Sequence, residues 1–154
     1  MDDYVKMAED KGRRIIENLI KGRVMNYEFT QEPLNPIDLF VTGYTTTASI
    51  EIKDREKYTA DFIENLGGHY IKKKKYDNLM KTMESGYTPY FTAIFKDWIY
   101  VWDLTKITPE WEHKEMEINN FNNKTKRDYE ITYLHTSEAI KRYETHKYKD
   151  EQDN

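Results

Sequence analysis

The sequence predicts an α/β protein in which helices flank one mixed β-sheet. Three observations favour this class: an amphipathic stretch opens the chain, a strictly alternating segment lies at residues 48–53, and a glycine ends a second helical stretch before two more strand-like segments. A chain of 154 residues has the length of one domain. We therefore expect a core over residues 1–104, a C-terminal extension of the same domain over residues 105–154, and disorder from about residue 149.

The first element is an amphipathic helix from Asp3 to about Gly22. Its apolar residues recur at intervals of three and four positions: Ala8, Ile15, Ile16, Leu19 and Ile20. Polar and apolar residues alternate loosely over residues 24–29. A loop rich in residues that interrupt helices and strands follows at 31–36, and a mainly apolar run begins at 37–41. This pattern predicts one helix followed by two short strands.

A third strand is predicted at residues 48–53, after a turn at Gly43. Side chains of a strand alternate between two faces, which separates two apolar residues from three polar ones here. One face receives Ile50 and Ile52, and the other receives Ser49, Glu51 and Lys53. A hairpin about Gly43 would make this strand the neighbour of residues 37–41.

The second half of the core is predicted to contain a helix and a hairpin. Residues 58–68 show no clear pattern, whereas residues 70–84 place their apolar positions on one helical stripe: Tyr76, Leu79, Met80 and Met83. Gly86 ends this helix, and residues 89–95 and 98–104 are expected to form the two strands of a hairpin. The expected core is therefore α-β-β-β-α-β, with the second hairpin strand after it.

The C-terminal extension carries weaker signals. Residues 110–117 are acidic and residues 119–123 are rich in asparagine, so both are expected to be exposed connections. A strand is predicted near residues 129–133 and a helix from about Ser137. The four histidines have no ligand spacing typical of zinc, and all are expected on the surface: His69, His113, His135 and His146.

Composition and charge exclude several classes of protein. The chain has no cysteine, which excludes disulfides, thiolate metal clusters and a cysteine nucleophile. No apolar run approaches the roughly 18–20 residues of a membrane helix, and the N-terminus is acidic where a signal peptide is basic. The net charge of −4 argues against a protein that coats nucleic acid nonspecifically. We expect a soluble, cytoplasmic protein. Its lysine, asparagine and tyrosine content is typical of an AT-rich genome, and its size suits a phage.

Two acidic residues on adjacent predicted strands form the main candidate site. Asp38 lies at the start of one strand, and Glu51 lies thirteen residues later, in the next. Two carboxylates a few ångströms apart repel, and a cation or a shared proton between them relieves the repulsion. Oxygen ligands without histidine or cysteine favour Mg²⁺ or Mn²⁺, which typically complete their shells with water and phosphate oxygens. Lys53, on the same face as Glu51, could orient a metal-bound water, so the set predicts phosphodiester hydrolysis.

These residues resemble the motif of the PD-(D/E)xK nucleases. The resemblance lies in Pro36-Ile37-Asp38, the thirteen-residue gap, Ile50-Glu51-Ile52-Lys53, and the order of the elements around them. It covers about two thirds of the chain, and its spacing is most similar to that of archaeal-type Holliday junction resolvases and related phage nucleases. The resemblance implies a restriction-endonuclease-like fold and a Mg²⁺-dependent endonuclease that cuts DNA.

The resemblance also implies a role for each residue of the motif. Asp38 and Glu51 would be metal ligands, and the backbone carbonyl of Ile52 would contribute another. Lys53 would lie beside the attacking water. The implied catalytic set is therefore Asp38, Glu51 and Lys53.

Many members of that family take a further carboxylate from the first helix, and two residues compete for this role here. Glu17 lies 21 residues before Asp38, a separation similar to that of several members. On a helical wheel, Glu9 falls among Ile16 and Ile20 on the buried face, whereas Glu17 lies at the margin of that face. We favour Glu17 as the additional metal ligand.

A run of four lysines follows the motif. Residues 53–75 carry seven basic and four acidic side chains, although the whole chain has a net charge of −4. Lysine–phosphate contacts give affinity that depends on salt and carries no sequence information. The expected nucleic-acid contacts are Arg55, Lys57, Lys72, Lys73 and Lys75. Lys72 lies near Tyr76 on the helical wheel and is expected to point toward the site, although such runs are more often solvated helix faces.

Three functions from different classes fit these patterns. The favoured one is a divalent-metal-dependent DNA endonuclease, acting as a homodimer where both strands are cut. A non-catalytic nucleic-acid-binding or regulatory protein could retain the same fold. An interaction protein could instead use the aromatic and acidic C-terminal segment to bind a partner. For the motif itself, the alternative is that Glu51 and Lys53 simply occupy the solvent face of an alternating strand.

Overall fold

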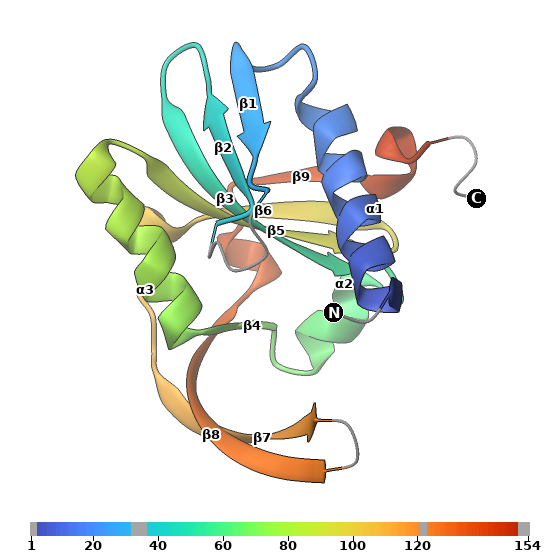
Figure 1. The fold of residues 1–154 in the computed structure, drawn as a ribbon, viewed down its shortest axis with the longest axis vertical. Coiled ribbons are helices and arrows are strands. Elements are labelled where there is room, and N and C mark those ends of the chain that lie inside the picture. The colour runs from blue at the N-terminus through green and yellow to red at the C-terminus, as the bar shows by residue number, and fades with distance from the viewer. Residues whose placement is uncertain (1–2, 32–36, 121–122, 151–154) are drawn as a thin grey trace.

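The computed structural model describes residues 3–31, 37–120 and 123–150 and contains two β-sheets (Figure 1). The larger sheet has six strands in the order β1-β2-β3-β5-β6-β9. Their bounds are Asn26–Phe29 for β1, Leu39–Thr42 for β2, Thr47–Arg55 for β3, Thr88–Phe95 for β5, Trp98–Asp103 for β6 and Lys141–Glu144 for β9. β3 and β5 are parallel, and the other neighbours are antiparallel, so the sheet is mixed.

Three helices and a smaller sheet complete the fold. The helices are α1 (Asp3–Ile20), α2 (Ala60–Asn65) and α3 (Lys73–Lys81). The smaller sheet has the order β4-β8-β7, with bounds His69–Lys72, Asn123–Leu134 and Glu112–Asn120. Four short 3₁₀ turns are η1 (Thr82–Ser85), η2 (Leu104–Lys106), η3 (Thr136–Glu138) and η4 (Thr145–Tyr148). In Figure 1, β7 and β8 form a curved ribbon that projects from the body of the molecule.

The six-stranded sheet is covered on both faces, because its central strands are apolar on both. On one face, α1 contributes Ile15, Ile16 and Leu19 to a core with Leu39, Val41, Ala48, Ile94 and Ile99. On the other face, residues of α2, α3, β4 and β8 pack against Phe91, Ala93, Phe95 and Trp102. This sandwich confirms the predicted α/β class with a mixed sheet flanked by helices, and α1, β1, β2, β3, α3 and β5 confirm the expected α-β-β-β-α-β order.

The second helix begins later than predicted. Residues 69–72 form β4 instead of the first turn of a helix, because His69 and Ile71 alternate into the core while β4 pairs with β8. α3 therefore starts at Lys73. The unassigned stretch before it contains α2, which Thr59 caps by accepting a hydrogen bond from the backbone N–H of Phe62 at 3.2 Å.

The C-terminal extension differs most from the prediction. Residues expected to be exposed connection form β7, and β8 begins earlier than the strand predicted at residues 129–133. The helix predicted from Ser137 is wrong: this segment holds η3, β9 and η4. β9 forms because the edge of β6 offers backbone partners, with Tyr100 opposite Arg142. Pairing with a distant strand therefore overrides the local helical pattern.

The last described residues contact the first helix. Asp150 accepts a hydrogen bond from Asn18 Nδ2 at 3.0 Å and forms an ion pair with Arg14 at 3.1 Å. Disorder of the tail from about residue 149 stays a prediction, because residues 151–154, like most of the predicted 31–36 loop, lie outside the described residues. Among the helices of the described residues, none has the length and apolar character that crossing a membrane requires.

Candidate active site

The chain places the side chains of Asp38 and Glu51 next to each other. β2 and β3 are antiparallel with Leu39 paired to Ile50, and Asp38 comes directly before β2. The backbone N–H of Asp38 donates to the carbonyl of Ile50 at 3.2 Å, so the chain departs by one residue from the β2–β3 register at this position. After burial, repulsion from the charge of Asp38 and a side-chain hydrogen bond with it raise the pKa of Glu51, which shows that the two side chains meet. The predicted hairpin is therefore present, and the two carboxyl groups are neighbours.

The faces of β3 are also as predicted. Ile50 and Ile52 pack against the core under α1. Glu51 and Lys53 lie on the opposite face and contact each other, with Lys53 Nζ 3.5 Å from Glu51 Oε1. Strand alternation thus puts a carboxylate and an amine on the side of the sheet that α3 covers.

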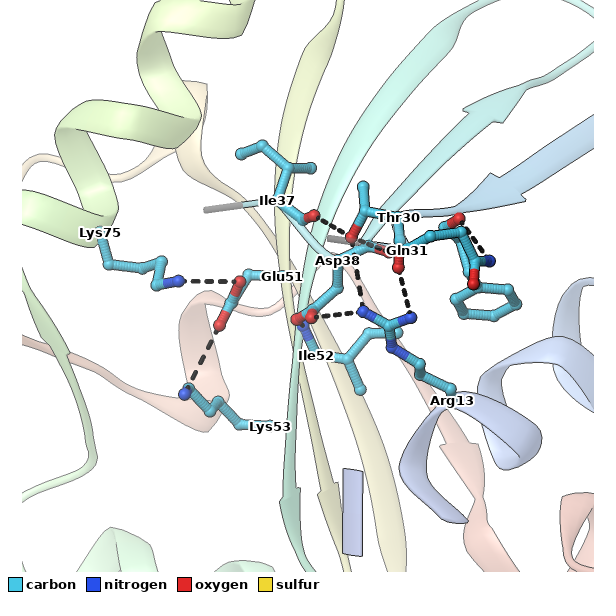
Figure 2. Close-up of polar contacts among 10 residues, drawn as sticks. Arg13, Thr30, Gln31, Ile37, Asp38, Glu51, Ile52, Lys53 and Lys75 are labelled. Atoms are coloured by element: carbon cyan, nitrogen blue, oxygen red, sulfur yellow. Dashed lines mark hydrogen bonds and ion pairs between the residues drawn. The ribbon is translucent and has the colours of Figure 1, made fainter. Parts of the chain in front are cut away.

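Asp38 is held in place by three elements (Figure 2). Thr30, after β1, donates its backbone N–H to the carbonyl of Asp38 at 3.0 Å and its hydroxyl to the carbonyl of Ile37 at 2.7 Å. The backbone N–H of Ile52 donates to Asp38 Oδ2 at 2.8 Å. Arg13 of α1 donates to Asp38 Oδ1 at 3.3 Å and to the carbonyl of Thr30 at 2.8 Å. Both carboxylate oxygens of Asp38 therefore have partners.

Glu51 is buried between two lysines. Its residue exposure is 3%, and Lys53 of β3 and Lys75 of α3 approach its two oxygens at 3.5 and 3.3 Å (Figure 2). Burial raises the pKa of Glu51 most, and repulsion from Asp38 adds to this, while the two lysines lower it. The resulting pKa is about 7, well above the ordinary value of 4.5. The site therefore holds a carboxyl that is partly protonated at neutral pH.

The two carboxyl groups of Asp38 and Glu51, here called the carboxylate pair, fit a hard divalent cation. Their oxygens are the ligands that Mg²⁺ and Mn²⁺ prefer, and the raised pKa of Glu51 means that negative charge is disfavoured there even with Lys53 and Lys75 nearby. Within the described part of the chain, no third acidic or histidine side chain joins them in a group that could hold a metal ion. Water and substrate oxygens would therefore have to supply much of the shell, as is usual for Mg²⁺.

Neither candidate of the first helix joins the carboxylate pair. Glu17 accepts a hydrogen bond from the hydroxyl of Tyr27 at 3.0 Å and forms an ion pair with Arg14 at 3.3 Å. These contacts tie α1 to β1. Glu9 is exposed, so the expectation that it lies on the buried face of the helix is wrong. The phase of α1 instead turns Arg13 toward Asp38.

Lys75, and not Lys72, points toward the site. Lys72 ends β4, and its Nζ lies 4.1 Å from the ring centroid of Tyr129 on β8. Because α3 begins one residue later, Lys75 lies four residues before the buried Leu79 and shares its face of the helix. This places its amine against Glu51. The expectation for Lys72 is wrong because this residue lies in β4, where helical periodicity does not apply.

The other predicted nucleic-acid contacts are Lys73, Arg55 and Lys57. Lys73 forms an ion pair with Asp77 at 2.8 Å, Arg55 donates to the carbonyl of Asp54 at 3.3 Å, and Lys57 is exposed. Their role in binding nucleic acid stays a prediction.

His69 is buried, which corrects the expectation that all four histidines are exposed. Its exposure is 4%, and its Nδ1 donates to the carbonyl of Tyr70 at 2.9 Å, so Nε2 carries the lone pair. Among the described residues, Nε2 has no hydrogen-bond partner. Burial, followed by the nearby charges of Arg55 and Lys53, lowers its pKa to about 3. The other three histidines are exposed, as expected: His113, His135 and His146.

Arg13 is the site residue that the sequence reasoning missed. It precedes Glu17 by one helical turn on the margin of the buried face of α1. The signal in the sequence is a basic side chain on the first helix, which can serve as a counterion to the predicted carboxylates. Its guanidinium links α1, the segment after β1 and Asp38.

Comparison with known proteins gives a distant likeness in structure alone. No protein-family model matches the sequence, and no curated protein matches it. Among solved structures, the chain is similar to Hjc, a Holliday junction resolvase from the archaeal hyperthermophile Archaeoglobus fulgidus. The TM-score is 0.49 and the identity 13%, over 81% of this chain and 96% of that chain. A likeness this distant does not establish a family, so the functional conclusion depends on the geometry of the site.

Proposed function

We propose that this protein is a divalent-metal-dependent endonuclease that hydrolyses phosphodiester bonds in DNA. One observation carries the proposal: Asp38, directly before β2, interacts with Glu51 of β3, and Lys53 lies on the same face as Glu51 at 3.5 Å from it. The resemblance of this motif to the PD-(D/E)xK nucleases supports the same chemistry. A purely structural role would not require a buried carboxyl group beside a second carboxylate, because that arrangement lowers the free energy of unfolding.

The residues of the site can take different roles in hydrolysis. Asp38, Glu51 and the carbonyl of Ile52 would hold Mg²⁺ or Mn²⁺, which when bound supplies a nucleophile by lowering the pKa of water. Lys53 can orient the attacking water or stabilise negative charge on the phosphoryl group. Arg13 fixes the carboxylate of Asp38 through Oδ1.

The finer parts of the proposal concern the substrate and the assembly. Branched DNA is the first substrate to test, because the spacing of the motif resembles that of Holliday junction resolvases. One carboxylate pair can cut one strand at a time. Cleavage of both strands by simultaneous action would therefore need a homodimer with two sites.

A second candidate function has its own support. Three basic groups, from Arg13, Lys53 and Lys75, form ion pairs with the carboxylate pair, and no third acidic ligand joins it among the described residues. A protein that binds nucleic acid without cutting it could use the same arrangement as a structural ion-pair network. Metal dependence separates the two candidates.

The first prediction is that cleavage requires Mg²⁺ or Mn²⁺ and each motif side chain. Branched, linear and single-stranded DNA would be incubated with wild type, Asp38→Asn, Glu51→Gln and Lys53→Met, in metal or in chelator. Each substitution should lower the cleavage rate by about 100-fold or more, because each removes a ligand or a charge next to the reacting phosphate. Thermal unfolding would establish that the variants are folded.

Matched controls are available on exposed positions. Glu84→Gln and Lys96→Met remove the same kinds of charge from the exposed surface and should leave cleavage unchanged. DNA retention without metal-dependent cleavage of any substrate would favour the non-catalytic candidate. Absence of both binding and cleavage would contradict both candidates.

A further inference from the structure

The β7–β8 ribbon has two chemically different faces. The register of β4, β8 and β7 places every second residue of neighbouring strands on the same side. One side, here called the tyrosine face, holds Tyr70, Lys72, Glu112, Lys114, Met116, Arg127, Tyr129, Ile131 and Tyr133. The other side of the ribbon, here called the acidic face, holds His113, Glu115, Glu117, Lys126, Asp128 and Glu130.

The two faces carry opposite charge. The tyrosine face has three basic side chains, Lys72, Lys114 and Arg127, and one acidic side chain, Glu112. Over residues 113–117 and 126–130, whose side chains the structure describes, the acidic face has four acidic side chains and one basic one, Lys126. In a chain of net charge −4, this separation concentrates positive charge on one side of a projecting element. A polyanion would therefore be attracted to the tyrosine face and repelled by the other.

Tyrosine rings order two of these cations. Lys72 Nζ lies 4.1 Å from the ring centroid of Tyr129. Lys114 Nζ donates to the hydroxyl of Tyr133 at 3.1 Å and lies 5.7 Å from its ring centroid. An ammonium group has three donors, so each lysine keeps donors for a further anionic partner. The rings thus present the amines in fixed positions, which lowers the entropy lost on binding.

The strands that carry the tyrosine face, β4 and β8, contact α3, the helix that contributes Lys75 to the candidate active site. Lys72 begins the four-lysine run, and Lys75 at its other end contacts Glu51 at 3.3 Å. Lys72 is paired with Ile131, four residues from Arg127 along β8. At about 3.3 Å per residue, the face extends roughly 13 Å from Lys72 to Arg127. Phosphates of one DNA strand recur every ~3.4 Å along the helix axis, so several phosphates can lie along it.

We propose that the tyrosine face of the β7–β8 ribbon binds the phosphate backbone of duplex DNA flanking the bond that is cut at the carboxylate pair. This inference rests on the proposed function and assigns the ribbon as its substrate-binding arm. Lys114 and Arg127 are the residues newly assigned to phosphate contact, and Lys72 lies on the same face. The acidic face points away from the duplex.

The ribbon offers a matched experiment. Lys114→Gln/Arg127→Gln removes two charges from the tyrosine face, and Lys126→Gln removes one charge from the acidic face of the same ribbon. Binding would be measured by fluorescence anisotropy in chelator, over a series of salt concentrations, with duplexes of about 10 and about 30 base pairs. Cleavage would be followed in parallel with Mg²⁺. Thermal unfolding of each variant establishes that it is folded, and the single Arg127→Gln variant replaces the double one if needed.

For the longer duplex, the double variant should lower the slope of log affinity against log salt by about 1.8, since each phosphate contact contributes about 0.9. Lys126→Gln should leave the slope unchanged, and the shorter duplex should respond less to the double variant. An unchanged slope in the double variant, or an equal effect of Lys126→Gln, would overturn the inference. If wild type still cleaves DNA with Mg²⁺ in that case, the proposed function stands. Wild type that neither binds nor cleaves any DNA overturns both.

Discussion

Glu51 combines burial, a like-charged neighbour and two lysines, and the balance among them sets its protonation. Burial and repulsion from Asp38 raise its pKa to about 7, whereas Lys53 and Lys75 act in the opposite direction. Because the lysines do not restore the ordinary value of 4.5, the protein holds a carboxyl that resists ionisation. A divalent cation would reverse this balance, because metal binding favours the ionised carboxyl and releases its proton.

The raised pKa of Glu51 should make the free energy of unfolding depend on pH. A folded-state pKa above the unfolded value means that protonation favours the folded state. This contribution is fully present below about pH 4.5 and is lost as the pH rises through about 7. The difference in free energy of unfolding between wild type and E51Q should therefore change by on the order of 1 kcal/mol between pH 6 and pH 8.5. Urea unfolding at the two pH values measures it.

The exposed Glu84→Gln variant serves as the control for this measurement, and its difference from wild type should be the same at both pH values. A pH-independent difference for E51Q as well would mean that Glu51 is ionised throughout this range. In that case Lys53 and Lys75 outweigh burial, which would favour the ion-pair network over a cation-binding site.

At the scale of single residues, the sequence predicted the parts of the site that local geometry determines. Alternation along β3 puts Glu51 and Lys53 on one face, and the hairpin that joins β2 to β3 brings Asp38 next to them. Arg13 and Lys75 come from helices, and their directions depend on where each helix begins and how it crosses the sheet. Those are tertiary properties, which a helical wheel does not contain.

Among the elements, the strand–helix junction at β4 and α3 shows how packing overrides local pattern. A window over residues 70–84 has helical periodicity, yet its first residues become a strand because β8 supplies a backbone partner. The partner lies about sixty residues further along the chain, so no local window can reveal it. The sequence pattern also did not predict β7, for a related reason. Its polar side chains carry little hydrophobic alternation, and its pairing with β8 holds it in place.

The attachment of α1 to β1 gives a prediction about Glu17. Its carboxylate accepts a hydrogen bond from Tyr27 and pairs with Arg14. Glu17→Ala should lower the free energy of unfolding by about 1 kcal/mol, the usual value of such a hydrogen bond. The Mg²⁺ concentration for half-maximal cleavage should not change, because Glu17 lies outside the carboxylate pair. Titration of cleavage with Mg²⁺ and urea unfolding measure the two effects.

Glu9→Ala is the control for this comparison, since Glu9 is exposed on the same helix and should affect neither quantity. A tenfold or larger increase in the Mg²⁺ requirement for Glu17→Ala, without a matching loss of stability, would show that Glu17 turns to the metal when it binds. The same result for Glu9→Ala would assign the role to that residue.

At the scale of the whole molecule, the C-terminal extension is built into both sheets. β9 pairs with β6, and β8 is the partner of β4. The indole N–H of Trp102, a central core residue, donates to the carbonyl of His135 at 2.8 Å, and Thr145 donates its hydroxyl to the carbonyl of Phe95 at 2.8 Å. Residues after 104 therefore satisfy polar groups of the core and supply part of its apolar surface.

This arrangement predicts that residues 1–104 do not fold alone. A chain ended after Leu104 loses the strand that pairs with β4 and exposes the edge of β6, which leaves buried backbone groups of both strands without partners. Its near-UV circular dichroism should lack native signal, and heating should give no cooperative transition. A control chain keeps the base of the ribbon but replaces everything beyond the Glu115–Asp128 pair with an Asn-Gly turn. That chain should unfold cooperatively, because the deleted pairs contact each other across the ribbon. Cooperative unfolding of the 1–104 chain near the wild-type midpoint would instead make the extension a separable appendage, and the substrate-binding arm could then be removed without loss of the fold.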